Sequence, residues 1–257
     1  MFSVVIPIYN HAKFVRQAIW SALRSPLVHE ILVIDDGSQD GSHKIAVEMA
    51  AAHSGRVRDL TPPSRGNRGA PERLNELVAL ARCEWVAVLN SDDVFVSGRF
   101  EAIVRHPEFP DCDFAFGNLL LIDERGALTG AKRGPLDSWT PFRPSLELLR
   151  MLAERRFMEL LYEQNHLITT SNMVFRKSLH THLGGFRPYR YVHDWDFALR
   201  AMLLGRPAYI RRFLTGYRIH RHNTILETEA KGNNETRTML DRFREESARF
   251  ADTRGMV

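Results

Sequence analysis

Two adjacent aspartates, Asp92 and Asp93, are the side chains best placed to do chemistry, because they come soon after the apolar run at residues 85–89. This short run is rich in β-formers, which predicts a strand buried on both faces of a sheet. Open α/β sheets bind ligands at the carboxyl ends of their strands. Neighbouring carboxylates repel each other unless a cation or hydrogen-bond donors compensate, and their oxygens suit Mg²⁺ or Mn²⁺ bound to substrate phosphates. The alternative interpretation is a polar turn in which one aspartate starts a helix.

Two further pairs of polar residues follow predicted strands in the same half of the chain. Asp35 and Asp36 close one apolar run, at residues 30–34, and Tyr9 with Asn10 closes another. Strands and helices alternate here at a spacing that indicates right-handed crossovers and a parallel sheet. In such a sheet these ends project from one edge, so we expect the three polar pairs to converge on one crevice. The alternative for Asp35 and Asp36 is a tight turn with helix-capping character.

Hydrophobic periodicity predicts the elements that position these residues. In the first half it predicts strands at 2–8, 30–34, 57–60 and 85–89, and helices at 14–23, 41–53 and 71–81. In the second half it predicts strands at 114–122, 167–175 and 209–214, and helices at 193–205 and 234–250. Residues 134–144 look irregular, and residues 145–162 look partly helical.

The composition limits the class of protein. With 257 residues, of which 44% are hydrophobic, the chain can bury one core, as a single α/β domain or a domain with an appendage. The net charge of +4 suits anionic small ligands, and no basic block interleaved with aromatics indicates nucleic-acid binding. The two cysteines, Cys83 and Cys112, lack metal or redox spacing and are expected to be buried thiols.

No stretch reaches the length of a membrane span, and no charged leader precedes an apolar core, so we expect a cytoplasmic protein. The charged amphipathic helix at 234–250 is expected to pack on its own domain or on a partner, which leaves a homodimer through this helix open. Peripheral attachment to a membrane surface is the other interpretation of this helix.

As an ordered set, the motifs resemble those of the family 2 glycosyltransferases of the GT-A fold, which are inverting, metal-dependent and use nucleotide sugars. The matching segments, in the same order over residues 2–222, are SVVIPIYN at 3–10, IDDGSQDGS at 34–42, NRG at 67–69 with Asn75, LNSDD at 89–93, GGF at 184–186, HDWD at 193–196 and YRIH at 217–220. Each motif alone is weak, whereas the ordered set is specific.

The resemblance implies a fold and a division of the chain. The fold is α/β of the GT-A type: a Rossmann-like, mostly parallel central sheet flanked by helices, with an acceptor-side α+β half and a C-terminal helix. Residues 1–110 would form the nucleotide-sugar-binding half and residues 111–225 the acceptor-binding and catalytic half. Residues 226–257 would form a C-terminal helical tail.

The resemblance also implies roles for single residues. Asp194 would be the general base, and Asp93 with His220 would hold Mn²⁺ or Mg²⁺ on the donor diphosphate. Asp92 would hold the ribose or assist at the metal, and Asp35 would accept a hydrogen bond from the nucleobase. The implied nucleotide-sugar-binding residues are Pro7, Tyr9, Asn10, Asp35, Asn67, Arg68, Arg73 and Asp92. Asp36, by contrast, would support the turn.

The sequence departs from the family pattern at four positions. Asn90 stands where an aspartate is common before Ser-Asp-Asp, which removes one acidic contact. Leu74 falls where an arginine is common, so the diphosphate contact would come from Arg68 or Arg73. The other two departures are Cys83 for a glycine and His193 for a glutamate.

The implied function is inverting transfer of a sugar from a nucleotide diphosphate sugar, with uridine as the favoured base, to a glycan or other hydroxyl acceptor. The displacement needs a cation to stabilise the departing diphosphate and a carboxylate to take the acceptor proton. The alternative is a non-catalytic nucleotide- or glycan-binding module, suggested by Asn90 and opposed by the retention of Asp93 and Asp194. A sugar-1-phosphate nucleotidyltransferase ranks last, because residues 7–11 do not form a glycine-rich phosphate loop.

Several residues of the second half keep a structural alternative. Asp194 is either the base or a first-turn carboxylate stabilised by the helix dipole, and Asp196 is expected to have the latter role. Trp195 is either a core residue or a sugar-stacking wall. His220 and His222 alternate along an extended segment, so at most one should face the site, and His220 has the better match.

Overall fold

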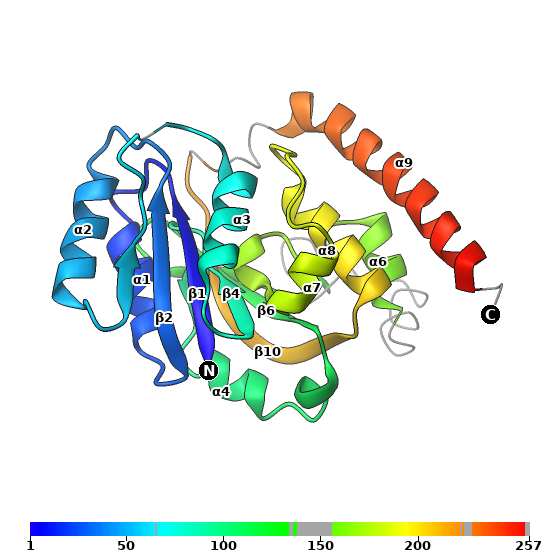
Figure 1. The fold of residues 1–257 in the computed structure, drawn as a ribbon, viewed down its shortest axis with the longest axis horizontal. Helices are drawn as coiled ribbons and strands as arrows, with labels where there is room; N and C mark the ends of the chain where they lie inside the picture. Colours follow the sequence, from blue (N-terminus) through cyan, green and yellow to red (C-terminus); the bar gives the residue numbers. More distant parts are fainter. Residues whose placement is uncertain (65, 134–135, 138–155, 222, 224–227, 255–257) are drawn as a thin grey trace.

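One sheet of ten strands crosses the described part of the chain, in the order β3-β2-β1-β4-β9-β6-β10-β5, with β7 and β8 added beside β6. Figure 1 labels its strands β1, β2, β4, β6 and β10. This computed structural model describes residues 1–64, 66–133, 136–137, 156–221, 223 and 228–254. The strands are β1 (Phe2–Ile8), β2 (Val28–Asp35), β3 (Val57–Asp59), β4 (Trp85–Val88), β5 (Val94–Phe95), β6 (Phe114–Ile122), β7 (Leu128–Arg133), β8 (Leu136–Asp137), β9 (Val174–Arg176) and β10 (Pro207–Arg218). The α-helices are α1 (Val15–Leu23), α2 (Ser42–Ala52), α3 (Ala70–Leu80), α4 (Arg99–Val104), α6 (Phe157–Glu163), α7 (Lys177–His182), α8 (His193–Leu204) and α9 (Thr228–Arg254), and the short 3-10 helices are η1 (Phe109–Asp111) and η2 (Thr170–Asn172).

The first half of the sheet is parallel, as predicted. β1 lies between β2 and β4, and β3 pairs with the outer side of β2. In β4, Trp85 and Ala87 belong to the core that includes α1, α2 and α4, whereas Val86 and Val88 belong to the core on the other face, with α3 and α8. Because successive side chains of a strand point to opposite faces, a strand with two buried faces requires an unbroken apolar run.

β9 connects the two halves of the sheet. It runs antiparallel between β4 and β6, so hydrogen bonding continues across the boundary predicted at residue 110. β10 is parallel to β6 and also pairs antiparallel with the short β5. The second half is therefore mixed, and the whole sheet is mostly parallel with helices on both faces, which confirms the predicted fold class.

Some element predictions for the second half were wrong in extent. Of the strand predicted at 167–175, only the end is a strand, because η2 occupies residues 170–172 and uses their side chains for hydrogen bonds. β10 is twice as long as the predicted strand at 209–214 and includes irregular pairing near Arg211 and Arg212. Residues 134–135, 138–155 and 222 lie outside the described residues, and with them most of the irregular and partly helical segments predicted at 134–162.

α9 packs against its own chain, at the end of the molecule opposite α2 (Figure 1). Its side chains Met239 and Phe243 are buried in the core that also contains α8. Nη2 of Arg187 lies 2.8 Å from Oε1 of Glu246, which adds an ion pair to this contact. The prediction that this helix packs on its own domain is confirmed for these side chains. Among the described helices, none combines the length and apolarity needed to cross a bilayer.

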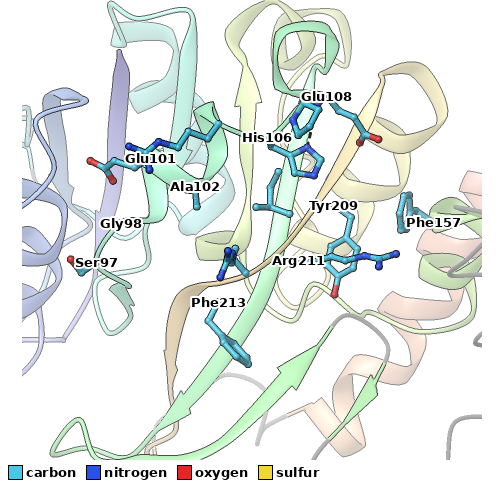
Figure 2. Close-up of a pocket in the computed structure, with 14 residues that line it drawn as sticks. Ser97, Gly98, Glu101, Ala102, His106, Glu108, Phe157, Tyr209, Arg211 and Phe213 are labelled. Carbon is cyan, nitrogen blue, oxygen red and sulfur yellow. Dashed lines mark hydrogen bonds between the residues drawn. The ribbon is translucent and has the colours of Figure 1, made fainter.

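A hollow of about 910 Å³ lies between α4 and the middle of β10 (Figure 2). Its walls include the arginines Arg105, Arg211 and Arg212, together with Tyr209 and Phe213. None of the residues for which the sequence predicts a catalytic or donor-binding role lines it. We therefore locate the site by the convergence of polar groups at the sheet edge, and not by the size of this hollow.

Candidate active site

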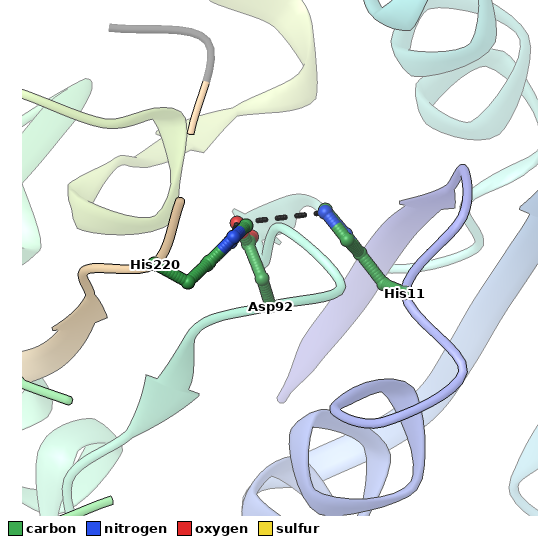
Figure 3. Close-up of side chains that lie close together, drawn as sticks. All are labelled: His11, Asp92 and His220. Carbon is green, nitrogen blue, oxygen red and sulfur yellow. Dashed lines mark hydrogen bonds and ion pairs between the residues drawn. The ribbon is translucent and has the colours of Figure 1, made fainter. Parts of the chain in front are cut away.

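Three side chains from distant parts of the chain meet beyond the carboxyl end of β4: His11, Asp92 and His220 (Figure 3). Oδ2 of Asp92 lies 3.0 Å from Nε2 of His220 and 3.7 Å from Nε2 of His11. One ligand-type atom from each residue lies within 4.8 Å of the other two. Imidazole nitrogens and a carboxylate oxygen are common ligands of divalent cations, so this cluster, the His11–Asp92–His220 cluster, is the candidate metal centre.

The charge of Asp92 is stabilised by its histidine neighbours. Burial alone would raise the pKa of Asp92, but the interaction with His11 and the hydrogen bond from His220 hold it below its ordinary value. A carboxylate that stays ionised at neutral pH can bind a cation. The predicted role of Asp92, to hold the ribose or assist at the metal, is compatible with this position.

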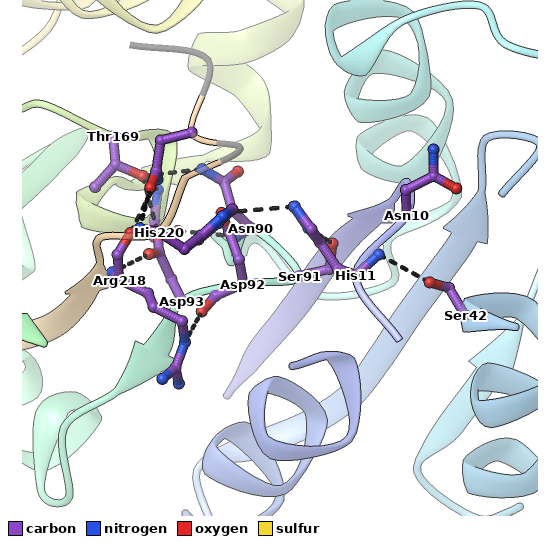
Figure 4. Close-up of polar contacts among 12 residues, drawn as sticks. Asn10, His11, Ser42, Asn90, Ser91, Asp92, Asp93, Thr169, Arg218 and His220 are labelled. Carbon is purple, nitrogen blue, oxygen red and sulfur yellow. Dashed lines mark hydrogen bonds and ion pairs between the residues drawn. The ribbon is translucent and has the colours of Figure 1, made fainter. Parts of the chain in front are cut away.

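Asp93 lies outside the cluster, in a ring of hydrogen-bond donors (Figure 4). Its Oδ1 accepts from the backbone N–H of Arg218 at 2.9 Å, and its Oδ2 accepts from Thr169 Oγ1 at 3.0 Å and from Ser171 Oγ at 2.6 Å. Burial, and then the charge of Asp92, raises the pKa of Asp93 to about 8. Both oxygens are already used inside the protein, so the geometry does not support the predicted metal-binding role of Asp93.

The hydroxyl-bearing turn at η2 also fixes Asn90, the residue that departs from the family pattern. The side-chain amide of Asn90 donates to Thr169 Oγ1 at 2.9 Å, and its carbonyl oxygen accepts from Thr170 Oγ1 at 2.7 Å. The backbone N–H of Asn90 donates to Ser171 Oγ at 2.8 Å. The loop after β4 is therefore tied to η2 by side chains, which explains why these residues do not continue β9.

The two aspartates after β2, Asp35 and Asp36, also differ in their hydrogen-bond partners. Oδ1 of Asp35 accepts from the backbone N–H groups of Gly37 at 3.2 Å and Ser38 at 3.0 Å. Within the described residues, Oδ2 of Asp35 is buried and has no hydrogen-bond partner. A buried oxygen without a donor is costly, so a ligand N–H at this position would be stabilising. This is compatible with the predicted contact to the nucleobase.

Asp36 holds the loop before α3. Its carboxylate accepts from the backbone N–H groups of Arg68 at 2.9 Å and Gly69 at 2.8 Å, and from Nε of Arg73 at 2.7 Å. Arg73 also donates to the carbonyl of Gly66 at 2.7 Å. The predicted turn-supporting role of Asp36 agrees with these contacts.

The two arginines proposed for the diphosphate have other partners. Arg73 is 1% exposed, and its guanidinium pairs with Asp36 and Glu76, so the geometry does not favour the predicted contact with the donor. The guanidinium of Arg68 pairs with Glu72 and Glu76 on the surface of α3. Asn67 is exposed on the loop before α3, beside the Gly37 turn.

Tyr9 and Asn10 stand at the rim of the site, directly after β1. Tyr9 is 46% exposed, which leaves its ring available to a flat ligand. Asn10 adopts a positive φ of 53°, and its Oδ1 accepts from the backbone N–H of Gln39 at 2.9 Å. Pro7 lies within β1 opposite Ile34 of β2. These contacts place the predicted β1 residues next to the Asp35 turn.

Asp194 begins α8 and is 7% exposed. Its Oδ2 accepts from the side-chain amide of Asn165 at 3.2 Å, and its Oδ1 from the backbone N–H of Trp195 at 2.7 Å. Burial raises the pKa of Asp194, and the neighbouring His193 together with these hydrogen bonds only partly offsets this effect. By contrast, Asp196 forms ion pairs with Arg187 and Arg200, which agrees with its predicted structural role.

Tyr217 connects the two ends of the site. Burial raises the pKa of its phenol, followed by the negative charges of Asp93, Asp92 and Asp194. Both candidate functional carboxylates, Asp92 and Asp194, are therefore among the charges that raise this pKa. Trp195 lies behind this region, where its Nε1 donates to the carbonyl of Leu161 at 2.7 Å, a contact that favours its packing role.

Asn75 fixes the Gly-Gly-Phe turn that leads towards α8. It accepts from the backbone N–H of Phe186 at 2.8 Å and donates to the same residue's carbonyl at 2.9 Å. Gly185 has a φ of 79°, and a Cβ there would lie 2.6 Å from Oδ1 of Asn75. Because Gly185 has no side chain, the Gly-Gly-Phe turn can pack closely against Asn75.

Several residues of the site carry no functional prediction from the sequence. They are His11, Ser91, Asn165, Thr169, Ser171, Tyr217 and Arg218. His11 follows the predicted donor-binding residues Tyr9 and Asn10 directly, and this position is the signal that could have identified it. The hydroxyl residues at 169–171 gave no comparable signal, because a run of Thr and Ser is typical of any turn.

A mostly parallel sheet with its polar residues gathered at the ends of β1, β2 and β4 defines an α/β protein of the GT-A class. The model of the family described as "Glycosyl transferase family 2" matches residues 3–184, and the chain belongs to that family. The glycosyltransferase GlyG of Streptococcus pneumoniae is 30% identical over 125 residues, which are 48% of this chain. The succinoglycan biosynthesis protein ExoU of Rhizobium meliloti is 31% identical over 146 residues, or 57% of this chain. The matched part is 40% of the length of each of these two relatives.

Two solved structures have a similar fold. S. aureus TarS 1–349 in complex with UDP-GlcNAc aligns with a TM-score of 0.63 at 18% identity, over 88% of this chain and 60% of the other. The mannosyltransferase PcManGT from Pyrobaculum calidifontis, in complex with GDP-Man and Mn²⁺, aligns with a TM-score of 0.56 at 17% identity, over 86% of this chain and 58% of the other. At these identities the likeness defines the fold.

Proposed function

We propose that the chain transfers a sugar, with inversion, from a nucleoside diphosphate sugar to a hydroxyl group of a glycan or other acceptor. The observation that carries this proposal is a site with two separate acidic functions: the His11–Asp92–His220 cluster, which is suited to a cation, and the buried carboxylate of Asp194 at the start of α8. Inverting transfer requires these two functions, one for the departing diphosphate and one for the acceptor hydroxyl.

Asp194 is the proposed general base. Its raised pKa brings the carboxylate closer to the basicity needed to take a proton from an acceptor hydroxyl. Asn165 holds one carboxylate oxygen and the N–H of Trp195 holds the other, so the group is oriented before an acceptor arrives. Asp196 is the weaker candidate because its carboxylate is paired with two arginines.

Asp92 and His220 are the proposed residues for a divalent cation, with Asp92 replacing the predicted Asp93. Their ligand atoms lie 3.0 Å apart, close to the separation of about 3 Å expected for neighbouring ligands on a cation about 2.1 Å from each. A bound Mn²⁺ or Mg²⁺ would stabilise the negative charge of the departing diphosphate. Family membership and the Mn²⁺ named with PcManGT support a metal at this position.

Tyr9 and Asp35 are proposed to bind the nucleobase. The exposed ring of Tyr9 offers a flat surface, and Oδ2 of Asp35, which has no hydrogen-bond partner in the described part of the chain, would accept an N–H of the base, such as that of uracil. TarS was solved with UDP-GlcNAc and PcManGT with GDP-Man, and both uracil and guanine can donate such an N–H. We favour uridine, and a cytoplasmic location near the source of nucleotide sugars stays a prediction.

The alternative function is a non-catalytic module that binds nucleotides or glycans. The buried Asp194 opposes it, because a pure binding site has no use for a carboxylate held without an arginine or lysine partner among the described residues. Incubation of the protein with UDP-GlcNAc, and in parallel with GDP-Man, in the presence of Mn²⁺ tests both functions. A transferase should release nucleoside diphosphate slowly by hydrolysis, whereas a pure binder should release none with any nucleotide sugar.

Asp194→Asn tests the base in the same assay. The substitution keeps the shape and removes proton acceptance, so donor hydrolysis should fall by about 10²–10⁴-fold. Affinity for UDP, measured by calorimetry, should change little, because Asp194 acts on the acceptor side. Asp241→Asn, at an exposed position of α9, is the matched control. Near-normal hydrolysis by Asp194→Asn would assign the base elsewhere.

A further inference from the structure

The His11–Asp92–His220 cluster offers two imidazoles and a single carboxylate. We propose that His11 is a third ligand of the divalent cation, and that the resulting two-nitrogen, one-oxygen set selects transition-metal cations such as Mn²⁺ over Mg²⁺. This inference rests on the cation site of the proposed function and adds to it a ligand and a metal preference.

The other oxygen-bearing side chains of the loop after β4 are committed elsewhere. Both oxygens of Asp93 accept hydrogen bonds, three in total, from Thr169, Ser171 and the backbone of Arg218. The side chain of Asn90 faces the hydroxyls of η2 with both its amide and its carbonyl. Asp92 is therefore the carboxylate that this loop can give to a cation, and further protein ligands must come from another segment.

His11 is held so that its Nε2 faces Asp92. Its backbone N–H donates to Ser42 Oγ at 2.9 Å, which fixes the main chain at the start of the loop. Its Nδ1 lies 2.8 Å from Oγ of Ser91, and this buried hydroxyl orients the ring. When Nδ1 donates to Ser91, the lone pair of the neutral imidazole lies on Nε2, which is the arrangement a metal-binding histidine needs.

The geometry requires a small contraction to hold a cation. Neighbouring ligands on a six-coordinate cation are about 3 Å apart when each lies about 2.1 Å from the metal. His220 already meets this separation from Asp92 at 3.0 Å, and His11 is 3.7 Å away. The side chain of His11 is 22% exposed, so it can move by this amount without disturbing the core. The two imidazole rings are nearly perpendicular, at 84°, and both can present a nitrogen to one point.

The ligand set determines the metal preference. Mg²⁺ prefers oxygen ligands and loses its bound water reluctantly, whereas imidazole nitrogens favour first-row transition metals. Two histidines with one carboxylate on one face of a metal are typical of such transition-metal sites, which keep the remaining positions open for other ligands. The open positions would here be available to phosphate oxygens.

Metal binding without turnover tests the inference. The metal-free protein is titrated with Mn²⁺, followed by electron paramagnetic resonance of the free ion, and with Mg²⁺ in competition, both with and without UDP. We expect at least about tenfold tighter binding of Mn²⁺ than of Mg²⁺, and a loss of about tenfold or more in Mn²⁺ affinity for His11→Gln. His11→Glu, which supplies oxygen in place of nitrogen, should narrow the preference for Mn²⁺. His29→Gln, at an exposed position of β2, is the matched control and should bind like the wild type.

Nitrogen coupling in the pulsed spectrum of bound Mn²⁺ provides a direct readout. The wild type should show coupling to two histidine nitrogens, and His11→Gln and His220→Gln should each show one. The inference is overturned if His11→Gln keeps both the Mn²⁺ affinity and the two-nitrogen signal, or if the wild type binds neither metal in the presence of UDP. If His11→Gln behaves like the wild type while the protein hydrolyses a nucleotide sugar, the inference alone fails. If the ligand pattern is found but no nucleotide sugar binds or is hydrolysed, the proposed function alone fails.

Discussion

The two acidic pairs of this protein share a sequence pattern and differ in how each carboxylate is used. After β2, Asp36 ties down the loop before α3, while Asp35 keeps one oxygen without a partner among the described residues. After β4, Asp93 accepts three hydrogen bonds, while Asp92 faces two histidines. In both pairs the second aspartate anchors a distant segment, and the first is left with binding capacity at the site.

The difference between the pairs lies in the partners of the anchoring residue. Asp36 is paired with the buried arginine Arg73, so its charge is compensated directly. Asp93 has neutral donors around it, and its burial, followed by the charge of Asp92, raises its pKa to about 8 in spite of their hydrogen bonds. A neutral side chain should therefore replace Asp93 at a lower cost in stability than Asp36. Substitution of Asp35 or Asp92, by contrast, should weaken ligand binding.

The largest expected effect on ligand binding follows from neutralising one of the two aspartates of the second pair. Asp92→Asn should weaken Mn²⁺-dependent binding of UDP by at least about a hundredfold, because it removes the carboxylate of the cluster. Asp93→Asn should bind Mn²⁺ and UDP nearly as the wild type does, since an amide can donate to Thr169 and Ser171 and accept from Arg218. Calorimetry on both variants decides between them, and the reverse ranking would restore Asp93 as the metal ligand.

The first pair should respond most strongly in stability. Asp36→Ala leaves the buried guanidinium of Arg73 without its main partner, which should lower the free energy of unfolding by about 3–5 kcal/mol. Urea unfolding measures this change. Asp241→Ala removes an exposed aspartate of α9 and should cost less than about 1 kcal/mol. Equal effects of the two substitutions would contradict the anchoring role of Asp36.

Asp35→Asn should affect ligand binding more than stability. The amide oxygen can still accept from Gly37 and Ser38, but a donor replaces the acceptor that we propose for the nucleobase. The affinity for UDP should fall by about 1–3 kcal/mol, the usual cost of an unsatisfied polar group. Calorimetry and thermal melting of the same preparation separate the two effects. A large drop in melting temperature with unchanged UDP affinity would make Asp35 a purely structural residue.

The smallest expected effect is a shift in pH dependence caused by a substitution beside Asp194, which belongs to neither pair. Its pKa is raised by burial, so the acid limb of donor hydrolysis should lie above the ordinary aspartate value of 3.8. Asn165 donates to the ionised carboxylate and lowers this pKa. Asn165→Ala therefore raises the pKa further, and the acid limb should move to higher pH while the plateau at high pH stays similar. A pH–rate profile measures this, and a shift to lower pH would contradict the assignment.

The sequence was sufficient to predict the structure of residues whose environment is set by their neighbours along the chain. The unbroken apolar runs of β1, β2 and β4 predict buried parallel strands, and Asp36 next to Gly37 predicts a turn. The sequence was insufficient where the partner lies far along the chain. Asp92 and Asp93 are the same residue type at adjacent positions. Their different roles depend on contacts with hydroxyls at η2 and with the end of β10, and the sequence near position 93 does not predict these contacts.

The position of Arg73 shows the same limit for basic residues. An arginine at the start of a helix, next to a presumed phosphate site, is a reasonable diphosphate ligand, but α3 turns its side chain to the buried Asp36. Only the packing of α3 on β1 and β2 determines this direction. His11 is the opposite case, since it lies beside recognised motif residues and its importance follows from contacts with Ser91 and Asp92.

The insertion of β9 between β4 and β6 has a consequence for the order in which the chain can fold. β4 forms early in synthesis, but its second neighbour, β9, begins only at Val174. At ~5–20 residues per second, the edge of β4 stays unpaired for on the order of ten seconds on the ribosome. Unpaired strand edges invite association with other chains, so we expect nascent chains that end before residue 174 to need chaperone protection. Protease protection of β4 in ribosome-bound chains that end just before and just after β9 would measure this requirement.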